Sequence, residues 1–419
     1  MARARGCGQM DWTATRARGL ARLAEFLPAA GRTYAERRNH DDGPVEGGRS
    51  NVSQLSPWLH AGLIAEAEVL EAVLARHSPR AAEKFIAEVF WRLYFKGYLE
   101  QRPSVWASYC AGRDAALAAL ERNAGLAAAY SQAAEGRTGI AAFDTWAREL
   151  VETGYLHNHA RMWFASIWIF TLRLDWQLGA DFFLRHLVDG DAASNTLSWR
   201  WVAGLHTRGK HYLARADNIA RYTAARPGGP LAAGGLAEEA EPLTEPVEHA
   251  RRLPDLPPPL AAGDLGEPFA LLLHDEAAHH GPLALPAGPA LVIGASRPQA
   301  RTPGEIGAPS SRFTAAAMEG GMAEAAAAFG CPAAEWRAGE PLAPLLAAAG
   351  VERLVVPWLP AGWTRDALAP GLAALAEQGR VVTLLGPLER ATWPHAKAGF
   401  FGVAKQIDAL LGETGIGGG

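Results

Sequence analysis

A buried helical stretch between residues 157 and 173 constrains this fold more than any other feature of the chain. It is apolar on nearly every side, with Trp163 and Trp168 among isoleucine, leucine and phenylalanine residues. A helix that is apolar all round is a buried helix. Arg161 and Asn158 lie within the stretch, and buried cations and amides need polar partners. The sequence therefore predicts a site built around a large polar cofactor, with the acidic segment DGDAASN close behind it.

Helical patterns continue through the first half of the chain. We expect helices over residues 12–34, 80–99 and 107–135, and another that begins near Ile140. From residue 224 to residue 268 the chain is rich in proline, glycine and alanine, including PGGP and LPPPL, and has no strong periodicity. Such a composition is typical of a linker.

Short apolar runs then alternate with alanine-rich helices. The runs FALLLHD, ALVIGAS, VERLVVP and RVVTLLG read as strands. The helices are expected over residues 314–328, 341–349 and 365–378, and near 398–411. Alternation of this kind indicates a parallel α/β layer. We therefore predict a multi-domain protein, with an all-α domain over 1–226, a linker over 227–267 and a smaller Rossmann-like α/β domain over 268–414.

Composition limits the class of protein. The chain has 419 residues, of which 49% are hydrophobic, so sizeable cores can form. Arg173 and Asp175 interrupt the longest apolar run, which is too short for a membrane span. The N-terminus has no apolar core of a signal peptide, and the three cysteines, at positions 7, 110 and 331, are scattered. We expect a cytoplasmic protein that does not enter a membrane.

Several local patterns leave two interpretations open. Ten of the fourteen tryptophans precede residue 227, and they serve either core packing or stacking and electron transfer. The six Lys and Arg residues between 200 and 226, against one acidic residue, indicate either a phosphate-binding surface or a solvated basic face. A histidine-rich loop after the first strand is more typical of a polar loop than of a metal site, so we expect no metal. Its residues are His274, Asp275, His279 and His280.

Ordered motifs over roughly residues 20–225 carry a family resemblance. They are TYAERRN, VEGGRSNVSQLS, AEVFWR, EGRTG, YLHNHARMWFAS, DWQLG and LVDGDAASNTLSWRWVAG. Together they resemble the flavin-binding domain of the DNA photolyase and cryptochrome family, in its branch that repairs cyclobutane pyrimidine dimers. The resemblance implies a photolyase-type all-α domain that binds FAD.

The resemblance also implies the residues that hold FAD. Arg161 would pair with Asp189, Asp191 would lie near the ribose and the ring edge, and Asn195 would face flavin N5. The loop before the second helical region would hold the phosphates and the ribityl chain through Tyr34, Ser53, Leu55 and Ser56. Val52 stands where the family usually has a threonine.

A lesion pocket and an electron-transfer chain follow from the same resemblance. The residues that would grip a flipped pyrimidine dimer are Glu88, Trp91, Asn158, Met162 and Trp201. Two indoles supply stacking surfaces, while a carboxylate and an amide supply hydrogen bonds. Trp199 and Trp176 match the first two members of the family's tryptophan chain, and Asn123 occupies the third position. Leu93 replaces the glutamate that usually follows Trp-Arg.

Three functions are open at this stage. The first is a deoxyribodipyrimidine photolyase, a lyase that repairs DNA by light-driven electron transfer from reduced flavin to a flipped-out dimer. Its partner would be damaged DNA. The second is a cryptochrome-like blue-light photoreceptor without repair activity, which would act on a protein partner. The third is a flavoprotein with another binding or redox task. The family normally places an antenna domain first, so the C-terminal α/β domain resembles a relocated antenna domain, for which we assign no chromophore.

Overall fold

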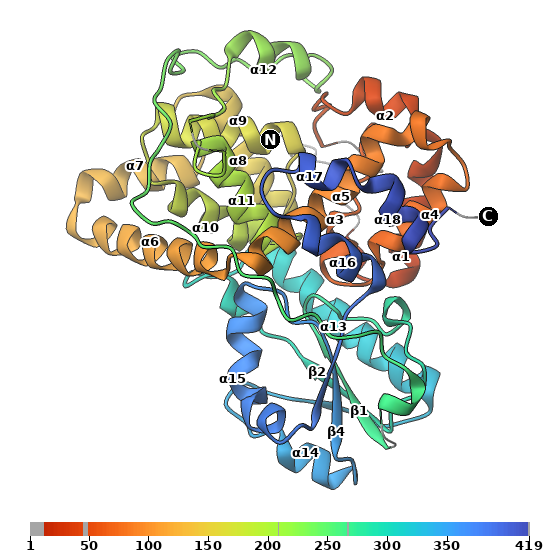
Figure 1. Ribbon diagram of the computed structural model, residues 1–419. Coiled ribbons are helices and arrows are strands. Elements are labelled where there is room, and N and C mark those ends of the chain that lie inside the picture. The colour runs from red at the N-terminus through yellow and green to blue at the C-terminus, as the bar shows by residue number, and fades with distance from the viewer. Residues whose placement is uncertain (1–11, 45–48, 208, 266–267, 418–419) are drawn as a thin grey trace, which may run out of the picture.

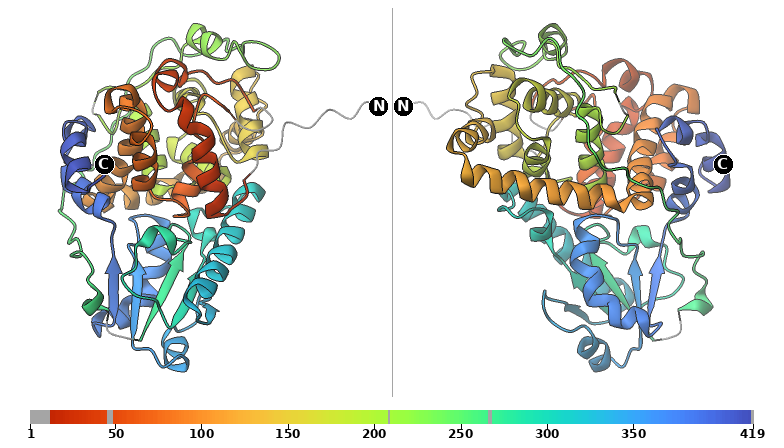
Figure 2. Two further views of the ribbon diagram at one scale, coloured as in Figure 1. Left: turned by 90° about the vertical axis from the view of Figure 1, so that its right-hand side faces the viewer. Right: turned by 60° about the vertical axis from the view of Figure 1, so that its left-hand side comes forward.

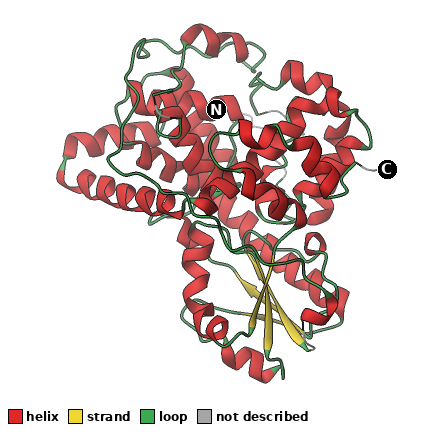
Figure 3. Ribbon diagram, viewed as in Figure 1, coloured by secondary structure: helices red, strands yellow, loops and turns green. Residues whose placement is uncertain are grey.

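A computed structural model describes residues 12–44, 49–207, 209–265 and 268–417. Helices of the first half gather at one end of the molecule and the sheet lies at the other end (Figures 1 and 3). The helices of the first half are α1 (Arg16–Phe26), α2 (Arg32–Arg37), α3 (Ser56–His60), α4 (Glu66–Leu74), α5 (Pro79–Gln101), α6 (Pro103–Arg122), α7 (Ala124–Ala134), α8 (Ala141–Thr153), α9 (Asn158–Ser166), α10 (Trp176–His186), α11 (Ala192–Ala203) and α12 (Ala216–Tyr222). The predicted all-α character of this half is confirmed.

The boundaries of several helices differ from the prediction for local reasons. The expected helix 12–34 divides into α1, a 3-10 turn at Leu27–Ala29, and α2. The expected helix 107–135 breaks at Asn123, whose side chain accepts a hydrogen bond from Leu126 N at 3.0 Å and so caps α7. Asparagine is a favoured N-cap because its side chain satisfies a free backbone N–H.

A π-helical turn follows α9 at Ile167–Thr171. Leu172 N donates to Ile167 O at 2.9 Å, which is the i to i+5 pattern of a π turn. Arg173 then adopts a positive φ of 55° and ends the run. The stretch that reads as one apolar helix is therefore α9 plus a π turn, and both are buried around Trp163 and Trp168.

The second half contains a five-stranded parallel sheet in the order β3-β2-β1-β4-β5. The strands are β1 (Phe269–His274), β2 (Leu291–Ala295), β3 (Ala333–Glu335), β4 (Arg353–Pro357) and β5 (Val381–Leu384). Leu272 pairs with Ile293 of β2, and Leu271 with Val355 of β4. Every residue of β1 is buried, as expected for a parallel strand that is covered on both faces.

Helices cover the two faces of the sheet in separate layers (Figure 2). On one face, α13 (Ala308–Phe329) packs with Leu271 in a core that continues into α1, α4 and α5. On the other face, α14 (Ala343–Ala348) and α15 (Trp363–Glu377) pack against Leu272. The predicted parallel α/β layer is confirmed, and its inner core is shared with the helical half.

Two segments tie the halves together. Residues 224–261 lie extended along the helical half, where Leu243 N donates to Ala203 O and Arg252 N donates to Gln101 O. The expected C-terminal helix 398–411 is instead two short helices, α17 (Phe401–Ala404) and α18 (Ile407–Glu413), preceded by α16 (Pro387–Thr392). These three helices return from the sheet to α4 and α5 (Figure 1). Trp393 lies against Gly97 of α5, where a Cβ atom would approach the indole to 2.7 Å.

In the part of the chain that the structure describes, none of the helices is both long and apolar enough to cross a membrane. Cys110 and Cys331 are free thiols, and Cys7 lies outside the described residues.

Candidate functional site

A cavity of about 500 Å³ opens in the helical half. Its volume is within the range of roughly 300–1,000 Å³ that is usual for small-molecule and cofactor sites. Its wall comes from α2, the loop before α3, and helices α5, α9 and α11. The structure places in this wall all the residues expected to hold FAD or a lesion, which are Tyr34, Ser53, Leu55, Ser56, Arg161, Asp189, Asp191, Asn195, Glu88, Trp91, Asn158, Met162 and Trp201.

The ion pair of Arg161 and Asp189 forms one side of the cavity. Arg161 Nη2 lies 2.9 Å from Asp189 Oδ2, and Arg161 Nε donates to Leu156 O at 3.0 Å. Burial opposes ionisation of Asp189, but the Arg161 guanidinium lowers its pKa below the usual value. Asp189 Oδ1 is buried and makes no hydrogen bond with the described residues. This carboxylate is therefore charged and retains an acceptor for a ligand.

The N-terminus of α11 presents a second carboxylate and an amide. Asp191 caps the helix, because its Oδ1 accepts a hydrogen bond from Ser194 N at 2.6 Å. Asn195 Nδ2 donates to Ala180 O at 2.8 Å. That hydrogen bond fixes the amide group of Asn195, which lines the cavity and keeps its oxygen as a hydrogen-bond acceptor. A bound N–H group is the partner that such an oxygen prefers.

The loop before α3 is held in place by Arg22 of α1. The Arg22 guanidinium donates to Val52 O at 3.1 Å and to Ser53 O at 2.8 Å. Gln54 adopts a positive φ of 55°, and its side-chain oxygen accepts a hydrogen bond from Arg49 N at 2.7 Å. These contacts order the segment from Val52 to Ser56 along the cavity. Arg22 was not predicted as a site residue, and no sequence motif marks it.

Glu88 is ion-paired at the cavity wall. Arg38 Nη1 contacts Glu88 Oε1, and both side chains are about one-third exposed. The Arg38 guanidinium also lies 5.9 Å from the centre of the Tyr34 ring, and burial raises the pKa of that phenol. Arg38 thus holds the carboxylate that the sequence assigned to lesion binding. Arg38 was not predicted as a site residue, although it belongs to the motif TYAERRN.

Aromatic rings also line the cavity. Trp201 stacks on Tyr212, with ring centroids 5.8 Å apart and an interplanar angle of 26°. Trp91 stacks on Phe400 from the C-terminal segment, with centroids 4.0 Å apart and an angle of 16°. The neighbouring Leu93 is fully buried in the core that the C-terminal helices share, which explains an apolar residue at this position.

The three positions of the expected tryptophan chain are Trp199, Trp176 and Asn123, and their neighbours differ. Trp199 lines the cavity, is 1% exposed, and has its ring 6.3 Å from that of Trp168. Trp176 is buried and contacts Tyr109, with ring centroids 5.7 Å apart. Asn123, at the expected third position, caps α7. Trp168 is thus the tryptophan that directly neighbours Trp199.

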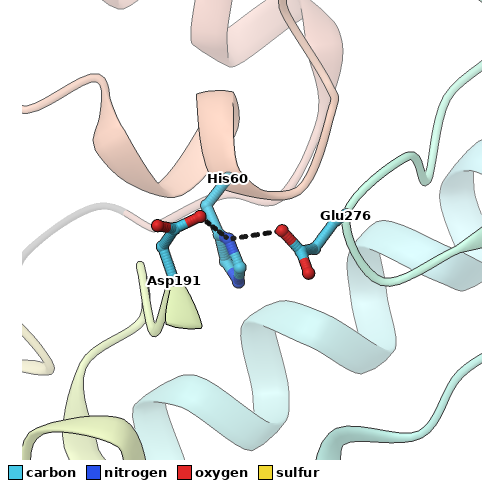
Figure 4. A group of neighbouring side chains, drawn as sticks. All are labelled: His60, Asp191 and Glu276. Carbon is cyan, nitrogen blue, oxygen red and sulfur yellow. Dashed lines mark ion pairs between the residues drawn. The ribbon is translucent and has the colours of Figure 1, made fainter. Parts of the chain in front are cut away.

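A buried polar cluster lies behind Asp191, where His60 stands between the carboxylates of Asp191 and Glu276 (Figure 4). His60 Nδ1 is 3.7 Å from an oxygen of each. His60 Nε2 lies 3.4 Å from the Arg301 guanidinium, which can only donate, so the proton of the neutral ring is on Nδ1. Lys96 Nζ already lies 2.8 Å from Glu276. The ammonium group of Lys96 already supplies a positive charge beside the two carboxylates, and a protonated Nδ1 has no lone pair for a metal ion. This cluster therefore does not fit a cation site.

Most polar side chains of the histidine-rich loop after β1 have protein partners, whereas His280 Nδ1 is buried and makes no hydrogen bond with the described residues. His279 Nε2 contacts Glu324 at 2.8 Å, and its Nδ1 accepts a hydrogen bond from Gly281 N. Asp275 accepts hydrogen bonds from Ser296 Oγ and Arg297 N. The loop has the geometry of a polar loop.

The basic segment from residue 200 to residue 226 is less basic at the surface than its sequence indicates. Arg200 is buried and paired with Glu245, and Arg226 is buried and paired with Asp41 and Glu149. Buried ion pairs use two of its six cations, so the two interpretations, a phosphate-binding surface or a solvated basic face, concern only the others. Lys210, Arg215 and Arg221 are exposed, and Arg208 lies outside the described residues.

Comparison with known proteins gives a family match for part of the helical half. A family model described as the FAD binding domain of DNA photolyase matches residues 85–225. The chain carries a photolyase-family FAD-binding domain. A deoxyribodipyrimidine photo-lyase of Streptomyces griseus is 33% identical over 194 residues, which are 43% of this chain and 41% of the relative. Another from Thermus thermophilus is 36% identical over 192 residues, which are 44% of this chain and 42% of the relative.

Two solved structures are also similar to about half of this chain. A bacterial class III photolyase from Agrobacterium tumefaciens has a TM-score of 0.42 and 28% identity, over 51% of this chain and 43% of that chain. A Synechocystis cryptochrome has a TM-score of 0.41 and 24% identity, over 53% of this chain and 46% of that chain. The matching part of this chain spans about two fifths of the length of its curated photolyase relatives.

The cavity of the photolyase-family domain fits FAD. Two buried polar atoms in its wall, Asp189 Oδ1 and Trp199 Nε1, make no hydrogen bond with the described residues. Buried polar atoms are nearly always hydrogen-bonded, so both indicate a polar ligand. Arg161 and Asn195 add a cation and an acceptor to the same wall. A ligand with a polar rim and flat apolar rings matches this mixture.

Proposed function

We propose that this protein repairs cyclobutane pyrimidine dimers in DNA by light-driven electron transfer from bound, reduced FAD. The observation that supports it is the convergence of two residue sets on one cavity. Asp189, Asp191 and Asn195 line it together with Glu88, Trp91 and Trp201. A cofactor and a flipped-out dimer, two adjacent bases of one strand, would then share one cavity, as electron transfer over a short distance requires.

In this proposal the FAD is held by Arg161, Asp189, Asp191 and Asn195, with Ser53 and Ser56 along the ordered loop. Bound FAD supplies a light-absorbing electron donor. The protein's own part is to order the wall and to exclude water, which strengthens every electrostatic contact inside. The side-chain oxygen of Asn195 can accept a hydrogen bond from an N–H group of the cofactor without adding charge.

The dimer would enter from the aromatic side. Flipping the dimer, two adjacent bases of one strand, out of the duplex costs only a few kcal/mol, because the lesion is already poorly stacked. Trp91 and Trp201 offer flat faces for the extruded bases, and Glu88 and Asn158 offer hydrogen-bonding groups. The reaction breaks the two carbon–carbon bonds between the bases, and the electron returns to its donor, so no net oxidation occurs.

A repair assay tests the proposal. Reduced, FAD-loaded protein is illuminated with blue light in the presence of an oligonucleotide that contains one thymine dimer, and restored thymines are counted by chromatography. The wild type should restore the oligonucleotide, and Glu88→Ala should lower the yield strongly. The matched control is Glu83→Ala, an exposed glutamate on the same helix α5. Absence of repair by FAD-loaded wild type would refute this function.

One contact favours a second function, a cryptochrome-like photoreceptor without repair activity. Phe400 stacks on Trp91, so the C-terminal segment touches the wall of the cavity directly. A change of charge in the cavity could thus reach a segment that a protein partner can bind. Hydrogen exchange of residues 393–405 in darkness and under blue light tests this idea. Light-dependent exchange without dimer repair would support the photoreceptor, and identical exchange would argue against it.

A further inference from the structure

The α/β half contacts the flavin-binding half through the edge of its sheet at which ligands usually bind. In doubly wound sheets, ligands bind outside the carboxyl ends of the strands, where the strand order reverses. Here the order β3-β2-β1-β4-β5 reverses beside β1. The residues just after β1 lie against the turn that follows α3, where Ala278 N donates to Ala61 O at 2.8 Å. A Cβ atom on Gly62 would lie 2.7 Å from the backbone of Glu276 and Ala277, so the contact is close.

Glu276 is the charged residue that this edge inserts into the helical half. Its side chain is 2% exposed. Thr364 Oγ1 of α15 donates to Glu276 Oε1 at 2.6 Å, and Lys96 Nζ of α5 lies 2.8 Å from Glu276 Oε2. A buried carboxylate needs such partners, because burial strongly disfavours an isolated charge. The α/β half therefore holds the ammonium group of Lys96 in place through Glu276.

Lys96 connects Glu276 to the wall of the FAD cavity. Its ammonium nitrogen lies 3.4 Å from Asp191 Oδ2, closer than the Arg92 guanidinium at 3.8 Å. Burial opposes ionisation of Asp191, but Lys96 and Arg92 hold its pKa well below the usual value. Arg92 is itself held by Glu66 at 2.6 Å. Asp191 thus faces the cavity as a carboxylate whose charge is balanced mainly by a lysine that Glu276 shares.

We infer that Glu276 is a positioning residue for the flavin site. It holds Lys96 between two carboxylates, and the α/β half thereby sets the electrostatic potential that Asp191 presents to the cofactor. This inference rests on the proposed place of FAD in the cavity and names a role for the second half of the chain. It predicts that the reduction potential of the flavin depends on a residue outside the flavin-binding domain.

The sign of the effect follows from charge. Glu276→Gln removes one negative charge and leaves Lys96 facing Asp191 alone, so the surroundings of the cofactor become more positive. A more positive environment favours the reduced, electron-rich flavin, and the midpoint potential should rise. Lys96→Met removes a positive charge, and the potential should fall. A shift of about tenfold in the reduction equilibrium is expected in each case, or about 30 mV for a two-electron couple.

The test is spectroelectrochemical titration of FAD-loaded full-length protein. Glu377→Gln, an exposed glutamate near the end of α15, is the matched control and should titrate as the wild type does. Opposite shifts in Glu276→Gln and Lys96→Met support the inference, since loss of folding alone would not give opposite signs. The midpoint potential of each variant tests the inference by itself. If one variant binds no FAD, the sign of the shift in the other variant still decides.

Two outcomes overturn the inference in distinguishable ways. A wild type that binds FAD and repairs or photoreduces, with unchanged potentials in the folded variants, refutes the role of Glu276 alone. A wild type that binds no FAD refutes the proposed function and, with it, this inference. The absorbance of the wild type at flavin wavelengths separates the two before any variant is compared.

Discussion

Phe400 stacks face to face on Trp91, with ring centroids 4.0 Å apart and planes within 16° of each other. An indole has two faces, so this contact leaves a single face of Trp91 for a base. Trp91 also lines the FAD cavity, whereas Phe400 comes from the segment that returns from the sheet. The C-terminal segment therefore fixes the orientation of a ring that the proposed function uses for stacking.

Removal of this stack should weaken recognition of damaged DNA. Aromatic pairs contribute about 0.5–1.5 kcal/mol beyond their burial, so Phe400→Ala should lower the affinity for a dimer-containing oligonucleotide by about fivefold. Phe401→Ala is the control, since that ring is 70% exposed. Fluorescence anisotropy with damaged and undamaged strands measures both variants. Tighter binding by Phe400→Ala would mean that Phe400 occupies the place of a base.

The ion pair of Arg161 and Asp189 predicts loss of cofactor. Asp189→Asn leaves a partly buried guanidinium without its counter-charge, and the loss of one partner of a desolvated, hydrogen-bonded charge pair costs about 2 kcal/mol or more. The Kd for FAD should therefore rise by roughly thirtyfold or more, as fluorescence titration of the apoprotein would show. Asp217→Asn removes the carboxylate of an exposed Arg–Asp pair on α12 and should leave the Kd unchanged. Equal Kd values for Asp189→Asn and wild type would place FAD elsewhere.

Local patterns predicted much of the fold. The helix α5 follows from its periodicity and from Ser78, whose hydroxyl accepts a hydrogen bond from Ala81 N and caps the helix. The parallel sheet follows from apolar runs such as FALLLH, which a strand covered on both faces requires. The resemblance in the order and spacing of motifs predicted that Tyr34, Glu88 and Asn195 share one site. All three line the cavity.

Contacts between distant parts of the chain could not be predicted in this way. Lys96 and Glu276 are 180 positions apart, and nothing in either local sequence indicates the other. Charge pattern also fails to distinguish a buried ion pair from a solvated cation. Arg226 belongs to a basic run, yet its partner Asp41 lies 185 positions earlier in the chain. Sequence alone specifies which residue carries a charge, and tertiary packing decides what that charge does.

Buried neutral histidines predict acid sensitivity. His157 is fully buried, and burial lowers its pKa to about 3. Because its pKa in the folded protein is below the unfolded value of about 6.5, the unfolded state binds more protons, and this stability is lost as pH falls from about 6.5 towards 3. By pH 4 the loss from His157 alone should be about 3 kcal/mol.

Urea unfolding between pH 7 and pH 4 measures this loss. His157→Asn keeps a residue that can cap α9 but cannot titrate, so its unfolding free energy should fall less steeply with pH. His395→Gln, at a partly exposed histidine, should follow the wild-type slope. Parallel curves for His157→Asn and wild type would contradict the prediction.

Two arginines of the same basic run should respond differently to substitution. Arg226 is 7% exposed, with its guanidinium 2.6 Å from Glu149, so Arg226→Met should cost about 3–5 kcal/mol of folding free energy. Arg221 is exposed, so Arg221→Gln should leave stability unchanged and reduce the salt dependence of DNA binding by about one counterion. Denaturation and binding at several salt concentrations test both. A weaker salt dependence of DNA binding in folded Arg226→Met would show that Arg226 contacts a phosphate group.

The contact between Trp199 and Trp168 predicts a route for electrons that enter the cavity. Trp199 lines the cavity, and its ring lies 6.3 Å from Trp168, while Gly179 leaves room for both indoles. Trp199→Phe should strongly slow photoreduction of bound FAD under blue light with an external reductant, and Trp168→Phe should slow it as well. Trp336→Phe, a buried exchange in the outer core of the sheet, should not. If Trp176→Phe slows photoreduction and Trp168→Phe does not, the electron passes through Trp176, whose ring lies beside Tyr109.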